Sequence, residues 1–362
     1  MSQALTPEPT SFAAPVWSDA QREASFNVWL SALAPTHGLN IASVRSASAD
    51  ASFRRYFRVD ATVGSLIIMD APPEKEDCHP FAKVAGLMHA AHLQVPQVLA
   101  WDEVNGFMLL TDLGAQTMMQ VINPDNAVAN QGLYLQAVDA LIAWQLASKP
   151  DVLPPYDEAL LRRELALFPD WYLAQHRGVT LNAEDRRTLD DAFNLIIAHN
   201  LAAPRVYVHR DFMPRNLMIS GVAAQPRLGV LDFQDAVYGP ITYDIASLMR
   251  DAFLSWDEDF CLDITIRYWD KARKAGLPVG DDFGEFYKGV EWMGLQRHLK
   301  VAGIFARLTL RDGKPQYLAD TPRFIHYIRS TCTRYIQLKP LLRLIERLEG
   351  IEVPNGYAFG RV

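Results

Sequence analysis

The sequence predicts an α+β protein of two lobes, a small β-rich N-terminal lobe followed by a larger, mainly helical C-terminal lobe. Strand-like runs separated by turn residues occupy residues 53–112. After Gly114, apolar residues recur at helical spacing through most of the chain, interrupted by a short β-like stretch at 205–232. With 362 residues, 49% of them hydrophobic and 21% charged, the chain is long enough for two or more globular domains.

The N-terminal part begins with an aperiodic stretch and a helix. Residues 1–16 are rich in Pro, Ser, Thr and Ala, which indicates a flexible arm. Residues 21–33 carry apolar side chains at helical spacing, and Pro35 and Gly38 mark the end of this predicted helix.

The predicted N-lobe spans residues 17–112. Residues 53–60 and 65–71 are predicted as strands joined by a Gly-containing turn, and 97–112 as two more strands around the hairpin dipeptide Asn105-Gly106. A helix is predicted between the two pairs, over residues 80–93. This arrangement indicates a small, mostly antiparallel β-rich lobe.

The predicted C-lobe spans residues 113–362. Its helices are predicted at 131–148, 157–176 and 184–200, and almost continuously from 243 to 349. In the β-like stretch at 205–232, each apolar run ends at polar residues. Functional side chains are expected in the loops that begin at these points.

Charge and cysteine content exclude several classes of protein. The 35 Lys and Arg residues and 42 Asp and Glu residues give a net charge of −7 without a basic stripe, so we expect no nucleic acid partner. Because no apolar stretch approaches the roughly 18 residues of a spanning helix and no signal peptide is visible, we expect a cytoplasmic protein without a membrane partner. Cys78, Cys261 and Cys332 have no metal-ligand spacing and are expected to be reduced thiols.

The residues from His209 to Asn216 follow the pattern HxDxxxxN, and a strand-like run ending at Asp232 comes soon after. Phosphoryl transfer needs a carboxylate that orients or deprotonates the acceptor hydroxyl, and oxygen ligands for Mg²⁺. Asp211 is predicted to be the base, and Asn216 and Asp232 the metal ligands. His209 is expected to support the loop by hydrogen bonding and not to transfer the proton itself.

The segments HRDFMPRNLM and VLDFQDAVYGPITYDIASLMRD resemble the aminoglycoside phosphotransferase and choline kinase family, the small-molecule branch of the protein-kinase-like fold. The resemblance spans about residues 25–340. It implies a bilobal protein-kinase-like fold that uses ATP and Mg²⁺, with Asp211, Asn216 and Asp232 in the roles given above. It also implies that the N-lobe covers the nucleotide and that the C-lobe carries catalysis and acceptor binding. Asp244, in the YDIA segment, is expected to belong to the scaffold and to accept backbone N–H groups of the loop that contains Asn216.

In such a fold, adenine binds to the backbone that joins the lobes, here Thr111, Asp112 and Leu113. The loop before the first predicted strand has no GxGxxG pattern, so its expected phosphate contacts are backbone N–H groups, Ser52 and the arginines Arg54 and Arg55.

One departure from the family pattern concerns the cation that binds the phosphates. Met69 stands about where a kinase-like fold has its phosphate-binding lysine, and residues 78–101 contain no acidic partner for one. Our hypothesis is that an arginine of segment 54–58, or Mg²⁺ itself, supplies the missing positive charge.

A narrower resemblance concerns the acceptor. The segments SFRRYFRV, IIMDAPPEKEDCHPF, HRDFMPRNLM and LDFQDAVYGPITYDIASL resemble bacterial cell-wall-recycling kinases that phosphorylate N-acetylmuramate and N-acetylglucosamine at the anomeric hydroxyl. This implies α-1-phosphate products for peptidoglycan recycling, and a link to a downstream nucleotidyltransferase only through the pathway. Candidate substrate residues are Gln234, Asp235, Trp292, Gln296, Arg297 and Lys300. For the four residues of the 291–300 helix, a solvated charged face over a core stripe is an equally good explanation. Asp235 is explained about as well by a contact with the metal ligands.

Three alternatives stay open at this point. An aminoglycoside acceptor would need an acidic cleft, and the acidic residues at 257–263 are also explained as a solvated surface. A choline-like acceptor would need an aromatic cage, for which the Trp residues are too scattered. A nucleotide sensor with weak catalysis would explain the absent lysine, but it would have no chemical need for Asp211.

Overall fold

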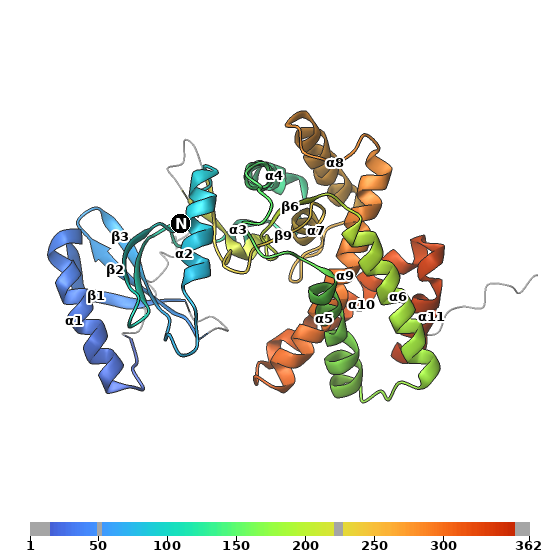
Figure 1. Ribbon diagram of the computed structural model, residues 1–362, viewed down its shortest axis with the longest axis horizontal. Coiled ribbons are helices and arrows are strands. Elements are labelled where there is room, and N and C mark those ends of the chain that lie inside the picture. Colours follow the sequence, from blue (N-terminus) through green and yellow to red (C-terminus); the bar gives the residue numbers. More distant parts are fainter. Residues whose placement is uncertain (1–14, 49–52, 221–226, 352–362) are drawn as a thin grey trace, which may run out of the picture. The chain divides into compact units, whose positions relative to one another are not determined.

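The computed structural model describes residues 15–48, 53–220 and 227–351. The chain forms two compact units (Figure 1): unit 1 contains residues 1–116 and 218–235, and unit 2 contains residues 117–217 and 236–362. The segment 218–235, which the sequence assigns to the C-lobe, therefore groups with the N-terminal unit. Of the predicted flexible arm, residues 1–14 lie outside the described part of the chain.

Unit 1 is built on a five-stranded antiparallel sheet in the order β1-β2-β3-β5-β4. Two helices, α1 and α2, lie on opposite sides of this sheet (Figure 1). The elements are α1 (Ala20–His37), β1 (Leu39–Ser48), β2 (Arg55–Ala61), β3 (Gly64–Asp70), α2 (His79–Ala90), β4 (Val98–Asp102) and β5 (Phe107–Thr111).

The core of unit 1 lies between α1 and one face of the sheet. Phe26 of α1 packs edge-on against Phe57 of β2 and Phe107 of β5, with ring centroids 5.6 and 5.5 Å apart. Leu30, one helical turn later, and Ile68 of β3 are fully buried in the same cluster. Because each such side chain contributes about 1.5–3 kcal/mol when buried, this face anchors the helix to the sheet.

A buried ion cluster joins the same helix and sheet. The carboxylate of Asp70, at the end of β3, is fully buried between two arginines. The Nε atoms of Arg22 in α1 and Arg55 in β2 each donate to it at 2.8 Å. The Arg55 guanidinium also lies 4.1 Å from the ring centroid of Trp17. A buried carboxylate is tolerated only with such partners, so this cluster fixes α1 on the sheet.

The hairpin of β7 (Leu217–Ser220) and β8 (Arg227–Val230) is attached to unit 1 by backbone hydrogen bonds. The N–H of Ile219 donates to the carbonyl of Gln116 at 2.9 Å, and the N–H of Val230 donates to the carbonyl of Gln94 at 2.8 Å. A Cβ atom on Gly229 would lie 2.7 Å from the side chain of Leu113, so glycine permits close packing here. These contacts explain why residues 218–235 belong with the N-terminal unit.

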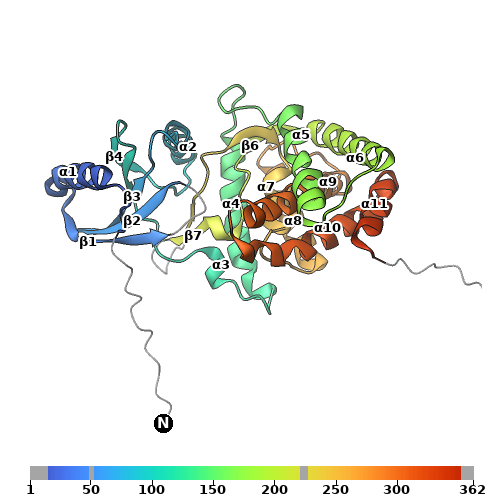
Figure 2. The ribbon, with the colours of Figure 1, turned by 90° about the horizontal axis from the view of Figure 1, so that it is seen from below.

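Unit 2 is mainly helical (Figure 2), and several of its helices pack against α9 (Phe283–Leu310). Every residue of α9 from Val290 to Lys300 is buried. The first elements are α3 (Met118–Val121), η1 (Val128–Asn130), α4 (Gln131–Leu146), α5 (Glu158–Leu167), η2 (Phe168–His176), α6 (Ala183–Leu201), β6 (Arg205–Val208) and η3 (Pro214–Asn216). They are followed by β9 (Val237–Pro240), α7 (Tyr243–Met249), α8 (Glu258–Lys274), α9, η4 (Pro315–Asp320), α10 (Thr321–Arg334), η5 (Ile336–Leu338) and α11 (Lys339–Glu349).

The structure confirms most of the predicted elements and corrects three. Strand β1 is missing from the prediction because its segment, LNIASVRSAS, is weakly apolar. The short strand β9, which pairs with β6, is also missing from it. The single helix predicted at 157–176 consists of α5 followed by a π-helix, η2, which has Pro169 near its start, a residue that lacks a backbone N–H.

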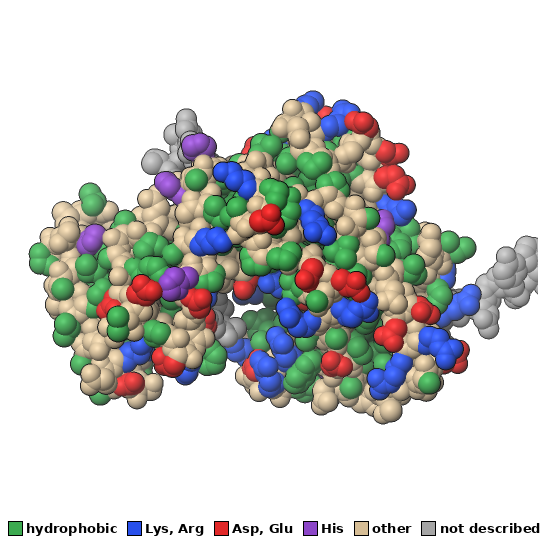
Figure 3. Space-filling model, viewed as in Figure 1, with side chains coloured by type: hydrophobic (Ala, Val, Ile, Leu, Met, Phe, Trp, Pro, Cys, Tyr) green, Lys and Arg blue, Asp and Glu red, His purple; other side chains and the backbone are tan. Residues whose placement is uncertain are grey.

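The surface shows no separation of charge by unit. On the face shown in Figure 3, acidic and basic side chains are interspersed over both units. Among the described residues, no helix has both the length and the apolar character needed to cross a bilayer.

Gly106 provides a test of the predicted hairpin. It has φ of 70°, and a Cβ atom at this position would lie 2.0 Å from the Ala71 carbonyl oxygen. We predict that Gly106→Ala lowers the free energy of unfolding by about 3 kcal/mol, from left-handed strain and the clash together. Gly64→Ala, in the turn between β2 and β3, has φ of 94° but open space. Gly64→Ala should lower the free energy of unfolding, measured by urea denaturation, by about 1–2 kcal/mol. Equal decreases for the two variants would contradict the clash with the Ala71 carbonyl.

Candidate active site

The loop from His209 to Asn216 leaves β6 at a buried carboxylate. Asp244, in the first turn of α7, accepts the backbone N–H of His209 at 2.7 Å and that of Arg210 at 3.0 Å. This confirms the scaffold role predicted for Asp244. Burial raises the pKa of the Asp244 carboxyl to about 6, against the opposing effect of His209 and of the two backbone hydrogen bonds.

Arg210 has an unusual backbone conformation. Its φ is 79°, in the left-handed region that L-residues other than Gly, Asn and Asp rarely adopt. Its N–H is held by Asp244, its carbonyl accepts the hydroxyl of Ser247 at 3.4 Å, and its guanidinium pairs with Glu164 of α5 at 2.6 Å. Such strain persists only when the surroundings determine the conformation, and here they do so through α5 and α7.

Glu164 is the centre of a second buried group of charges. Its carboxylate also pairs with the Lys300 ammonium of α9 at 3.0 Å and accepts the hydroxyl of Tyr156. Burial would raise the pKa of the Glu164 carboxyl, but the charges of Lys300 and Arg210 outweigh it and lower the pKa. Burial opposes the charged form of Lys300, yet the carboxylate of Glu164 raises its pKa, so the ammonium stays charged. Asp211 also interacts electrostatically with both cations.

Asp211 and Asn216 are brought together on this loop. The half-buried Asp211 donates its backbone N–H to Nδ1 of His209 at 3.2 Å, and its carbonyl accepts the Nδ2 amide of Asn216 at 2.9 Å. Since Nδ1 of His209 accepts a hydrogen bond, a neutral imidazole carries its proton on Nε2. The Asn216 amide is oriented by its nitrogen, which leaves the oxygen on the opposite side of the amide group.

Asp232 belongs to unit 1 and follows β8. It has φ of 62°, and its carboxylate accepts the Gln234 side-chain amide at 2.8 Å. The next residue, Phe233, is fully buried against Phe81 of α2, with ring centroids 5.0 Å apart. Phe233 therefore anchors the segment that contains Asp232, Gln234 and Asp235.

Asn216 and Asp232 flank one hairpin: Asn216 directly precedes β7, and Asp232 follows β8. Their amide and carboxylate oxygens are hard ligands, of the kind that Mg²⁺ prefers. The described residues contain no group of three or more His, Cys, Asp and Glu side chains that could hold a metal. The chemistry of these two side chains is compatible with Mg²⁺, and their role as metal ligands stays a prediction.

The predicted adenine-binding segment lies at the end of β5. The Asp112 side chain accepts Nε of Arg58 and the hydroxyl of Ser65, both at 2.6 Å, and the backbone N–H of Gly114 at 2.9 Å, so it acts as a structural anchor. The Thr111 N–H donates to the Gln97 carbonyl at 3.1 Å. Within ranges 15–48, 53–220 and 227–351, the backbone groups of Asp112 and Leu113 form no hydrogen bond with one another or with other residues.

The three residues predicted to contact the phosphates have different surroundings. Ser52 lies outside the described residues. The Arg55 guanidinium is engaged by Asp70, Trp17 and the carbonyl of Val16, so the structure gives it a role in the fold. Arg54 pairs with Glu76, which precedes α2 by three residues.

The four residues predicted on the 291–300 helix all lie in the buried part of α9. Trp292 packs against His199 and Tyr335, and Gln296 donates to the Leu161 carbonyl at 3.0 Å. These contacts are those of core residues. Lys300 belongs to the Glu164 group described above. Arg297 is 3% exposed, and within the described part of the chain its guanidinium forms no ion pair.

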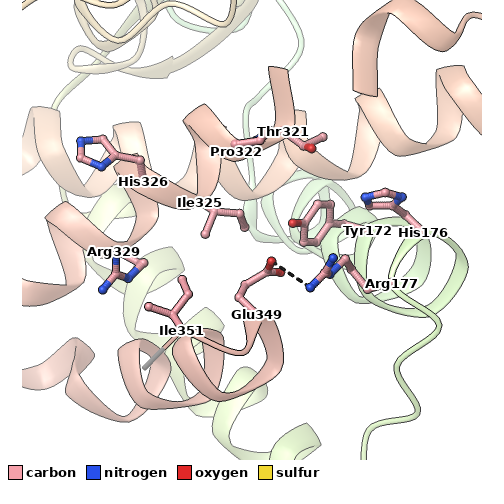
Figure 4. A pocket seen from close by; sticks show the side chains of 10 residues that line it. All are labelled: Tyr172, His176, Arg177, Thr321, Pro322, Ile325, His326, Arg329, Glu349 and Ile351. Carbon is pink, nitrogen blue, oxygen red and sulfur yellow. Dashed lines mark ion pairs between the residues drawn. The ribbon is translucent and has the colours of Figure 1, made fainter. Parts of the chain in front are cut away.

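Unit 2 also has a surface cavity of about 400 Å³ (Figure 4). It lies at the end of η2, beside α10 and the end of α11, and contains none of the predicted site residues. Its charged side chains are partnered: Arg177 pairs with Glu349 at 3.3 Å, and Arg329 pairs with Glu346 at 2.7 Å. We therefore do not assign this cavity to the active site.

Sequence reasoning missed Glu164, Arg210 and Glu76. Glu164 directly follows Arg162 and Arg163 in a helix of mixed polar and apolar residues. Only its burial distinguishes it from a surface acid, and a sequence does not display burial. Arg210 stands inside the motif itself, and its left-handed conformation is visible only in the structure. Glu76 lies in a charged turn, where a solvent-exposed residue is the ordinary expectation.

Comparisons with known proteins identify the family. Residues 43–280 match the family described as "Phosphotransferase enzyme family". A protein of Pseudomonas aeruginosa named N-acetylmuramate/N-acetylglucosamine kinase is 49% identical over 338 residues, which cover 91% of this chain and 98% of the relative. A protein of the same name from Neisseria meningitidis is 46% identical over 94% of this chain and 100% of its own length.

Solved structures agree on the fold. A choline/ethanolamine kinase family protein from Mesorhizobium loti has a TM-score of 0.59 at 15% identity, over 90% of this chain and 99% of its own. Ethanolamine kinase from Plasmodium vivax has a TM-score of 0.58 at 10% identity, over 95% and 98%. The chain thus belongs to the phosphotransferase enzyme family, as an ATP-dependent kinase with the bilobal protein-kinase-like fold of that family.

Proposed function

We propose that the protein transfers the terminal phosphoryl group of ATP to the anomeric hydroxyl of N-acetylmuramate and N-acetylglucosamine, with α-1-phosphates as products. The observation that carries this proposal is the 46–49% identity, over nearly the whole chain, to relatives named as kinases of these two sugars. Such products would be substrates for a nucleotidyltransferase in cell-wall recycling, and the reaction would take place in the cytoplasm.

In this proposal Asp211 orients the C1 hydroxyl and accepts its proton. An anomeric hydroxyl is more acidic than an ordinary alcohol, so a weak base in the right position is sufficient. The position of Asp211 is determined by the contacts of its own backbone with His209 and Asn216 and by Asp244 behind the loop. His209 supports the loop and takes no part in proton transfer.

Asn216 and Asp232 would hold the metal through their side-chain oxygens. Mg²⁺, when bound, neutralises charge on the phosphates of ATP. Gln234 holds the Asp232 carboxylate, and we propose that Gln234 and Asp235 also contact the metal environment or acceptor hydroxyls. The backbone of residues 111–113 would bind adenine.

The acceptor N-acetylmuramate carries a lactyl carboxylate, which N-acetylglucosamine lacks. Arg297 is the buried cation best suited to meet it, because it has no ion-pair partner among the described residues and its Nε has no hydrogen-bond partner there. Lys300 contributes positive charge beside Asp211. Trp292 and Gln296 would then act by supporting the helix that carries both cations.

The first test is ADP release with Mg²⁺ATP and a panel of acceptors: N-acetylmuramate, N-acetylglucosamine, glucose, kanamycin and choline. We expect turnover on the two N-acetylated sugars and an anomeric phosphate signal in ³¹P NMR. Asp211→Asn should lower kcat by at least about 10²-fold with both sugars. Turnover on kanamycin or choline alone would contradict the sugar assignment while leaving the kinase assignment intact.

Asp244→Asn tests how the loop is positioned. An asparagine amide presents a donor to one of the two backbone N–H groups, so we expect kcat to fall by about 10- to 100-fold with little change in the KM for ATP. Because the loop needs ionised Asp244 and its pKa is about 6, wild-type kcat should rise as the pH passes upward through this value. The variant should lack this rise.

A remote buried carboxylate provides the control for Asp244. Asp185, 6% exposed, pairs with Arg347 and does not contact the loop. Asp185→Asn should lower the Tm without changing the pH profile of kcat. The positioning role is excluded if Asp244→Asn retains the wild-type pH profile.

Arg297→Gln tests recognition of the carboxylate. We expect the KM for N-acetylmuramate to rise at least about tenfold, as expected for a lost charge-assisted pair, and the KM for N-acetylglucosamine to change much less. Equal increases for the two sugars would show that Arg297 acts through the fold of α9.

A further inference from the structure

The phosphates of ATP need a cation from the protein, and the usual position for one holds an apolar residue. Met69 of β3 is fully buried and pairs with Tyr56 of β2 and Met108 of β5. Helix α2 contains no acidic residue that could hold a lysine at that position. In protein kinases this lysine and its glutamate partner must both be in place for catalysis. If the protein supplies this charge, the cation comes from another position in unit 1.

Most arginines described in unit 1 are fixed by the sheet itself. Arg22 and Arg55 share the carboxylate of Asp70. Arg58 donates to both oxygens of Asp112 and to the carbonyl of Gly114. In each of these three guanidiniums, two nitrogens donate to a carboxylate, and one nitrogen donates to a backbone carbonyl. None of them can turn toward a ligand without breaking contacts that hold the fold together.

Arg54 differs in its position. It directly precedes β2, and its Nη2 lies 3.1 Å from Oε2 of Glu76. The side chains are 10% and 17% exposed, so the pair is largely dehydrated and its attraction is strong. Arg54 also acts electrostatically on Asp77 and Cys78, the residues just before α2. The ion pair thus connects the start of β2 to the start of α2.

We propose that Arg54 is the protein's phosphate-binding cation and that Glu76 is its positioning residue. The pair takes over both functions of the absent lysine–glutamate pair: it carries a positive charge to the nucleotide, and it couples α2 to the sheet. A guanidinium has five N–H donors in a planar fork, so it can bind a carboxylate and a phosphate together. The inference rests on the proposed function only in that the protein binds ATP.

The test is a series of dissociation constants for adenosine, AMP, ADP and ATP, measured with Mg²⁺ by calorimetry and without any acceptor. In the wild type, affinity should increase with the number of phosphates. Arg54→Met should weaken ATP binding by at least about tenfold and leave adenosine binding within about twofold. Arg54→Lys should restore part of the difference. Glu76→Gln should weaken ATP binding less than Arg54→Met does.

Two further variants separate phosphate binding from a structural role. The exchanged pair Arg54→Glu with Glu76→Arg rebuilds the ion pair with the cation on the other chain segment. It should recover the Tm lost in Arg54→Met without recovering ATP affinity. Arg45→Met, which removes an ion pair with Asp60 in the same sheet, should leave the whole series unchanged.

The proposal is overturned if Arg54→Met weakens adenosine and ATP binding by the same factor, if the exchanged pair restores ATP affinity, or if the wild type shows no gain from AMP to ATP. None of these measurements involves a sugar. If the acceptor assignment is wrong, the nucleotide dissociation constants are still expected to show the effect of Arg54. If the Arg54 assignment is wrong, the acceptors that support ADP release are still expected to be the two sugars.

Discussion

The active-site loop depends on one buried carboxylate. Asp244 accepts two successive backbone N–H groups, and the loop that carries Asp211 can leave β6 only where these bonds place it. Burial of a carboxylate is unfavourable, and here it raises the pKa, while the charges of His209 and Arg297 and the two backbone N–H donors of the loop favour the ionised form. Loop and carboxylate therefore stabilise each other, and loss of either would leave the other with unsatisfied polar groups.

Helix α9 extends this constraint through unit 2. The buried part of this helix contains Glu291 and Lys300, whose charges would be unfavourable without partners. Arg250 and Arg334 neutralise Glu291, and Glu164 neutralises Lys300. Because Glu164 also holds Arg210, the packing of α9 against α5 determines the charge beside Asp211. The same ion pairs thus hold the helical core together and define the electrostatic field of the site.

The helices and strands with strong hydrophobic periodicity could be predicted from the sequence. So could the candidate catalytic and metal-binding residues that stand in a recognisable motif, Asp211, Asn216 and Asp232. The helices around Phe26 and Leu141 and the hairpin at Gly106 follow from local pattern. Strand β1 could not be predicted, since its stability comes from pairing with β2 and not from its own weakly apolar residues. Glu164 and Glu76 could not be identified either, because their partners are distant in sequence and only burial distinguishes them from surface acids.

Two carboxylates of unit 1, Asp70 and Glu76, pair with arginines but have different roles. The first belongs to the fold, and we propose that the second belongs to the nucleotide site. Asp70 is fully buried and forms ion pairs with Arg22 and Arg55. These pairs hold α1 on the sheet and need no ligand. Glu76 pairs with Arg54, and Arg54 acts electrostatically on Asp77 and Cys78, which directly precede α2. The two arginines at Asp70 hold α1 on the sheet, whereas the Arg54–Glu76 pair is the one that we propose to meet the phosphates of a nucleotide. A lysine in place of Met69 on β3 would bury a charge beside Met108 and other apolar residues. A cation at Arg54 avoids the cost of burying that charge.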